Sequence, residues 1–152
     1  MTTSGDPGPG KRRLERPPSG RYRPTDRPMP AEGGQRRSRA VLFASAVALG
    51  LAAAITAAGI LEITAGLIAV AAIGGWAVAW ALRPGGLSVR DRLGTAIALA
   101  VVGVVLGQVG LWIYGRIEGG VLGPLDFLAE VYGPLVVLQI AAAAVAAWWT
   151  AR

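Results

Sequence analysis

The stretch "LGTAIALAVVGVVLGQVGLWIYG", Leu93–Gly115, contains no charged residue and decides the class of fold. A helix of about 20 predominantly apolar residues crosses the ~30 Å hydrocarbon core of a bilayer. Leu93–Gly115 has 23 residues, so it is long enough to cross as one helix. Comparable apolar stretches occupy residues 40–61, 63–82 and 131–151. The sequence therefore predicts an all-α membrane protein with four transmembrane helices.

The first two of these stretches are separated by Glu62 alone, so one long helix over residues 40–82 is an alternative. Such a helix would be about 65 Å long at 1.5 Å per residue, which is roughly twice the thickness of the hydrocarbon core. We therefore favour two helices joined by a tight turn near Gly59–Gly66.

Charge divides the chain into two regions. Residues 1–39 hold ten basic and four acidic residues, which account for the whole net charge of +6, and seven of the ten prolines. A segment of this composition buries too little apolar surface to offset the entropy lost on ordering. We therefore expect a disordered cytoplasmic tail over residues 1–39 and a four-helix membrane domain over residues 40–152. The alternative for the tail is an arm that docks on an acidic partner or on nucleic acid. The net charge is confined to the tail beside a neutral body, which makes nucleic acid the less favoured partner.

Basic residues also predict the orientation of the chain in the membrane. Fourteen Lys and Arg residues fall on the side that carries both termini, and only Arg116 falls on the other. Because cytoplasmic loops are enriched in Lys and Arg, we expect a multi-pass plasma-membrane protein with both termini in the cytoplasm. Arg36, Arg37 and Arg39, next to the first span, are expected to contact anionic lipid of the inner leaflet. The single Lys, the absence of Asn and the abundance of Ala, Gly and Arg indicate bacterial coding of high GC content.

Small residues recur along one face of the second and third spans. Their spacing of three or four residues places them in line on a helix, and small side chains allow transmembrane helices to approach closely. We expect these faces to hold the four helices together; the alternative is that the third span mediates self-association or binds another membrane protein. The residues are Ala71, Gly75 and Ala79 in the second span and Ala96, Ala100, Gly103, Gly107 and Gly110 in the third.

The segment between the third and fourth spans predicts a short helix of its own over residues 124–132. Pro124 suits the first position of a helix, and Leu125, Leu128 and Tyr132 would form its apolar face in the headgroup boundary. The Gly133-Pro134 pair should then break the helix before the fourth span. A merged helix over residues 124–151, kinked at the proline, is the alternative.

Polar residues of the membrane domain form one candidate site on the outer side. Buried glutamines usually bond across helices, and the alternative places them on a polar path beneath the outer loop. The candidate residues are Gln108 and Gln139 within the spans, with Glu62, Arg116, Glu118, Asp126 and Glu130 outside them.

Several classes of chemistry are excluded because the chain has no Cys and no His. It can form neither a disulfide nor a Ser-His-Asp triad, and it cannot ligate zinc or haem through those residues. We therefore assign no catalytic, cofactor-binding or metal-binding residue. The sequence favours a small non-enzymatic integral membrane protein, a structural or accessory subunit that packs through its small-residue helix faces. The alternative is a small transporter or channel component that uses Gln108, Gln139 and the acidic outer loop.

Overall fold

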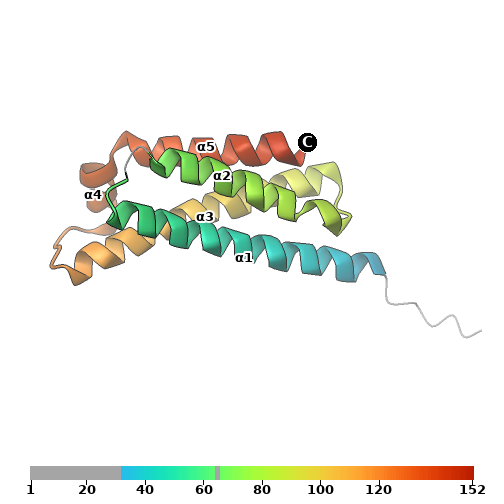
Figure 1. The fold of residues 1–152 in the computed structure, drawn as a ribbon, viewed down its shortest axis with the longest axis horizontal. Coiled ribbons are helices and arrows are strands. Elements are labelled where there is room, and N and C mark those ends of the chain that lie inside the picture. Colours follow the sequence, from blue (N-terminus) through green and yellow to red (C-terminus); the bar gives the residue numbers. More distant parts are fainter. Residues whose placement is uncertain (1–31, 64–65) are drawn as a thin grey trace, which may run out of the picture. The chain divides into compact units, whose positions relative to one another are not determined.

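The computed structural model describes residues 32–63 and 66–152. These residues form four long helices: α1 (Glu32–Ile60), α2 (Gly66–Ala81), α3 (Val89–Ile117) and α5 (Pro134–Ala151) (Figure 1). Each is long and apolar enough to cross a membrane, and the described residues contain no strand. The predicted class, an all-helical chain with four helices capable of spanning a membrane, is confirmed.

Helix α1 begins at Glu32, eight residues before the predicted start of the first span at Ala40. Residues 32–39, predicted as part of the disordered tail, instead continue the helix, and the side chains of residues 33–39 are exposed. An existing helix extends at little cost because each added residue completes one more backbone hydrogen bond. The remaining part of the predicted tail, residues 1–31, lies outside the described residues.

The turn after α1 ends the helix, so the single long helix over residues 40–82 does not form. Glu62 adopts a left-handed conformation, with φ of 57°. The Ile63 N–H donates to the Ala58 carbonyl and the Glu62 N–H to the Gly59 carbonyl, both at 3.0 Å. This pair of bonds is a Schellman motif, which satisfies carbonyl groups at the end of a helix.

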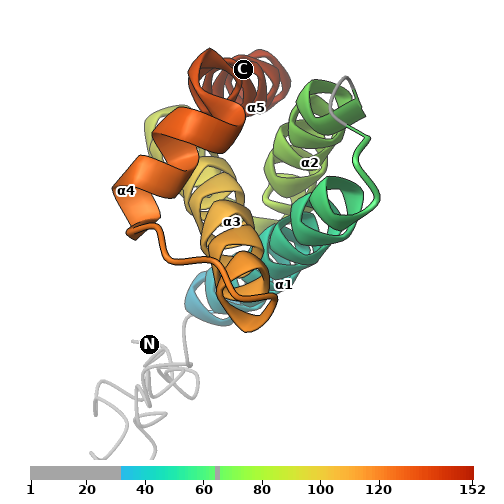
Figure 2. The same cartoon turned by 90° about the vertical axis from the view of Figure 1, so that its left-hand side faces the viewer.

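The four long helices form a bundle in which α1 and α5 lie diagonally opposite. Helix α1 packs on α2 and α3, α5 packs on the same two helices, and α2 also contacts α3 across the centre (Figure 2). The core consists largely of alanine, which lets helix backbones approach closely. Its most buried alanines, each at most 4% exposed, are Ala44, Ala48, Ala71, Ala79, Ala81, Ala96, Ala100, Ala143, Ala147 and Ala151.

The connection between α3 and α5 is helical but not one regular helix. Helix α4 (Pro124–Phe127) continues directly into η3 (Leu128–Tyr132), a π-helical turn. Gly133, with φ of 49° and ψ of −126°, then changes the chain direction before Pro134 starts α5. The predicted segment 124–132 is therefore separate from the fourth span, and the merged helix over residues 124–151 is not formed.

Candidate functional site

The central polar feature is a pair of glutamine side chains inside the bundle. Gln108 lies on α3 and Gln139 on α5, and they are 2% and 0% exposed. The Nε2 group of Gln108 donates a hydrogen bond of 2.6 Å to the Oε1 atom of Gln139. The two residues that the sequence placed in different spans are thus brought together, and they join α3 to α5.

This pair leaves two buried polar atoms without a partner among the described residues. They are Oε1 of Gln108 and Nε2 of Gln139. Exchanging O and N in both amides would reverse the donor and the acceptor but still leave one atom of each amide unpartnered. A buried polar group without a hydrogen bond costs about 1–3 kcal/mol. Each amide therefore keeps the capacity for one further hydrogen bond, Gln108 as an acceptor and Gln139 as a donor.

A small cavity adjoins Gln108 between α3, α5 and the α4–η3 segment. Its volume is about 160 Å³. Gln108 is the polar residue in the otherwise apolar lining of this cavity. Gln139 is not among the lining residues. The lining residues are Val105, Gln108, Val109, Trp112, Pro124, Leu128, Val136 and Ile140. Trp112 also donates through Nε1 to the Leu122 carbonyl at 3.2 Å, which holds the loop before α4 in place.

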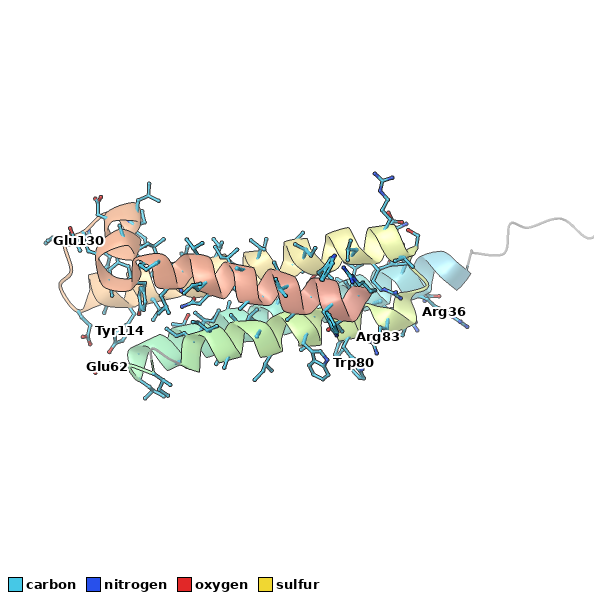
Figure 3. The ribbon with its side chains drawn as sticks, turned by 90° about the horizontal axis from the view of Figure 1, so that it is seen from above. Arg36, Glu62, Trp80, Arg83, Tyr114 and Glu130 are labelled. Carbon is cyan, nitrogen blue, oxygen red and sulfur yellow. The ribbon has the colours of Figure 1, made fainter. Side chains whose placement is uncertain are left out.

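The predicted outer charges do not converge on the glutamine pair. Glu62 and Glu130 lie at the end of the bundle opposite Arg36 and Arg83 (Figure 3). Glu118 accepts a hydrogen bond of 2.8 Å from the Tyr114 hydroxyl, four residues before it.

Arg116 donates through Nη1 to the Gly120 carbonyl at 3.0 Å, and it forms no ion pair with an acid in the part of the chain that the structure describes. Asp126 lies in the first turn of α4, where its charge is favourable to the helix dipole. Within residues 32–63 and 66–152, no group of three or more acidic side chains could hold a metal ion. Arg116, Glu118 and Asp126 therefore each interact within their own segment.

The small-residue face of α3 lies against α1. A Cβ atom added to Gly103 would come within 2.8 Å of the Ala48 carbonyl oxygen, and one added to Gly107 within 2.7 Å of Ile55 Cβ. A Cβ atom on Gly110 would collide with the Thr56 hydroxyl, which itself donates to the Gly107 carbonyl at 3.1 Å. Ala96 and Ala100, on the same helix, are fully buried.

The small-residue ridge of α2 lies against α5. A Cβ atom on Gly75 would collide with the backbone carbonyl of Ala143, and Ala71 and Ala79 are fully buried. Most of both predicted faces is thus covered within the chain.

Other small residues remain on the surface, in a groove between α1 and α2. The groove is apolar and has a volume of about 380 Å³. We call it the α1–α2 groove; it is lined by Val47, Gly50, Leu51, Ala54, Val70, Ile73, Gly74 and Ala77. Gly50 is exposed, and a Cβ atom added to it would meet no atom within 4 Å.

Leu125, predicted on the apolar face of the short outer helix, is 79% exposed. Phe127 turns inward instead, and its ring lies within 3.2 Å of a Cβ position on Gly115. Its ring also packs edge-on against Tyr132, five residues later, with centroids 6.0 Å apart. Residues five apart align because the turn is π-helical, whereas the prediction assumed the α-helical period.

Two arginines have a structural role that the sequence reasoning did not identify. Arg92 donates through Nε to the Ala151 carbonyl at 2.9 Å, and Arg83 donates through Nη2 to the Thr150 carbonyl at 3.2 Å. Both side chains therefore bond to carbonyl groups at the C-terminal end of α5. A positive charge there also interacts favourably with the negative end of the helix dipole. In the sequence analysis these arginines contributed only to the predicted orientation in the membrane.

Comparison with known protein families, with curated protein sequences and with solved structures finds no significant match to this chain.

Proposed function

We propose that the chain is a non-enzymatic accessory subunit of a bacterial plasma-membrane complex and binds a transmembrane helix of its partner in the α1–α2 groove. The observation that carries the proposal is the exposure of Gly50 and Ala54 beside Gly74 and Ala77 in that groove. Lipid gives helices no hydrophobic reason to associate, so association depends on close packing at small residues. Most other small-residue faces of the chain are already covered by its own helices.

The groove has the form that a partner helix requires. Four of its eight lining residues are Gly or Ala, and Ile73, which is 64% exposed, provides a bulky side chain at its surface. A second helix could therefore lie close to the backbones of α1 and α2 and contact Ile73 at the same time.

Co-purification of the full-length chain from its native membrane in mild detergent tests this proposal. We expect a stable partner with the wild-type chain and loss of that partner with Gly50→Leu, whose side chain would fill the groove. Gly94→Leu is the matched control, since Gly94 is also exposed and also open, but lies on α3. The proposal fails if Gly50→Leu retains the same partner as the wild type, or if both variants lose it equally.

The orientation, with both termini cytoplasmic, rests on the distribution of basic residues. Because the chain has no Cys, the accessibility of a single introduced cysteine shows on which side of the membrane that position lies. A maleimide that does not cross membranes should label Glu118→Cys in intact cells and Arg90→Cys only after the cells are opened. The reverse pattern would overturn the orientation.

A second candidate function, transport of a small uncharged solute, is favoured by the unpartnered amide atoms of the Gln108–Gln139 pair, of which Gln108 lines the 160 Å³ cavity. Proteoliposomes should then take up glycerol faster than empty liposomes, and Gln139→Ala should abolish the difference. Ser45→Ala is the control, since the Ser45 hydroxyl donates to the Val41 carbonyl of its own helix. Uptake equal to that of empty liposomes would argue against transport of this probe.

A further inference from the structure

Two adjoining cavities lie at the end of the bundle where α1 passes the turn η2 (Arg83–Gly85). Their volumes are about 420 and 460 Å³, and Phe43, Ala81 and Pro84 line both. Arg36 and Arg39 line the first cavity, and Trp80 and Arg83 line the second. We call these two cavities together the basic groove; Figure 3 shows Arg36, Trp80 and Arg83 at this end of the bundle.

The basic groove is built by close packing of η2 on α1. A Cβ atom on Gly85 would come within 2.7 Å of Ala40 Cβ, and Ala40 is only 6% exposed. The hydrogen bond from Arg83 Nη2 to the Thr150 carbonyl anchors the guanidinium group on one wall. A guanidinium group has five N–H donors, so others remain to bind a ligand.

The lining combines two chemistries that match the two parts of a phospholipid. Arginine binds phosphate oxygens with paired N–H donors, and of the described residues that line the basic groove none is acidic. Below the arginines, Phe43 and Trp80 are 55% and 53% exposed, although both are large and apolar. The amphipathic ring of tryptophan favours the boundary between headgroups and hydrocarbon, and Phe43 adds apolar surface beside it.

We propose that the basic groove binds one anionic phospholipid, with Arg39 and Arg83 donating to the headgroup phosphate and an acyl chain lying along Phe43 and Trp80. Phosphate free in water would leave the apolar floor uncovered, which is why we assign the site to a lipid. This proposal does not depend on the partner or solute proposed above.

The basic groove distinguishes between arginines that the sequence treated as equivalent. Arg36, Arg39 and Phe43 follow one another at intervals of three and four residues, so they share one face of α1. Arg37 is rotated by about 100° from Arg36 around the helix and lines neither cavity. A general attraction to an anionic surface would use Arg37 as much as Arg39, whereas a defined site would not.

Native mass spectrometry of the full-length protein, released from nanodiscs that contain equal amounts of phosphatidylglycerol and phosphatidylcholine, tests the proposal. We expect one phosphatidylglycerol to remain bound, and Arg39→Gln to weaken its binding about five-fold, the effect of one basic residue at an anionic surface. Arg37→Gln, which removes the same charge from the same exposed turn, should leave binding unchanged. Arg83→Gln is not the primary variant because it also removes the bond to Thr150.

Equal weakening by Arg37→Gln and Arg39→Gln would overturn the proposal, since binding would then follow net charge alone. Loss of selectivity for phosphatidylglycerol over phosphatidylcholine in the wild type would overturn it as well. Inorganic phosphate at millimolar concentration should not displace the lipid. Displacement would show a site for soluble anions and refute the lipid assignment, whereas a Phe43→Ser variant that weakens lipid binding would support it.

Discussion

The buried glutamine pair makes an unusual prediction about stability: removing both side chains should be better for the fold than removing one. Gln108 and Gln139 share a single hydrogen bond of 2.6 Å, and each keeps one polar atom without a partner among the described residues. Methionine has nearly the volume and shape of glutamine but no strong hydrogen-bonding atom. The perturbation is therefore a cycle of Gln108→Met, Gln139→Met and the double variant.

The expected magnitudes follow from counting polar atoms. Each single variant loses the one hydrogen bond and leaves both amide atoms of the remaining glutamine unpartnered, so it should be about 1 kcal/mol less stable. The double variant loses the same bond but also removes both unpartnered atoms, each of which costs about 1–3 kcal/mol. The double variant should thus be more stable than the wild type by about 1 kcal/mol or more.

Equilibrium unfolding of the purified protein in mixed detergent micelles measures these differences. Ser45→Ala serves as the control, because the Ser45 hydroxyl donates within its own helix, to the Val41 carbonyl at 2.9 Å. This control should change the free energy of unfolding by less than either single variant does. All four proteins should retain the same helical content, so that the comparison concerns packing alone.

A double variant about 2 kcal/mol less stable than the wild type, the sum of the two single effects, would refute the reasoning. In that case the two atoms would have partners in the folded protein that the helices themselves do not provide. Such a result would also favour the solute-binding function over the accessory function.

Three further substitutions test packing, capping and the outer segment. Gly75→Val should destabilise the bundle by about 1–3 kcal/mol in thermal unfolding, because its Cβ atom would collide with the Ala143 carbonyl. Gly94→Ala, whose added Cβ atom meets no atom within 4 Å, should be neutral or slightly stabilising. Equal losses of stability in the two variants would contradict this packing. Arg92→Gln should speed hydrogen exchange in the last turn of α5 and lower stability by about 1 kcal/mol, since a charged donor to the Ala151 carbonyl is lost. Unchanged exchange in that turn would exclude a capping role for Arg92. Burial raises the pKa of Tyr132 above its ordinary value of 10.0. Because the folded-state pKa is the higher one, the stability linked to this group is complete below the unfolded-state pKa and is lost as the pH rises through the folded-state pKa. Tyr132→Phe should remove that alkaline loss in pH-dependent unfolding, and parallel curves for the two proteins would refute this.

The number of helices and their approximate positions could be predicted because they depend on local composition. A charge-free stretch such as Leu93–Gly115 needs no tertiary information to be identified as a possible span. The ends of the helices were less predictable, since they depend on hydrogen bonds of single residues. Helix α3 starts at Val89 because the Ser88 hydroxyl accepts a hydrogen bond from the Asp91 N–H, and α1 ends where Glu62 takes a left-handed conformation.

The contacts between distant residues could be predicted only in part. Helical periodicity places Gly103 and Gly107 on one face, but it does not say which helix that face meets. The bond between Gln108 and Gln139 depends on the register of α3 against α5. The inward turn of Phe127 depends on a π-helical turn for which the sequence carries no clear signal.

The alanine-rich core described above also bears on how the bundle can move. Alanine has no side-chain rotamers, so burying it costs no side-chain conformational entropy. For the same reason an alanine side chain cannot change its packing by moving to another rotamer. The larger apolar side chains buried among these alanines are Leu51, Ile55, Leu67, Val78, Leu82, Val104 and Leu111. Elsewhere in the core the backbones themselves are the contacting surfaces. We therefore expect relative motion of the helices to be small sliding along their faces, with no repacking of side chains between alternative arrangements.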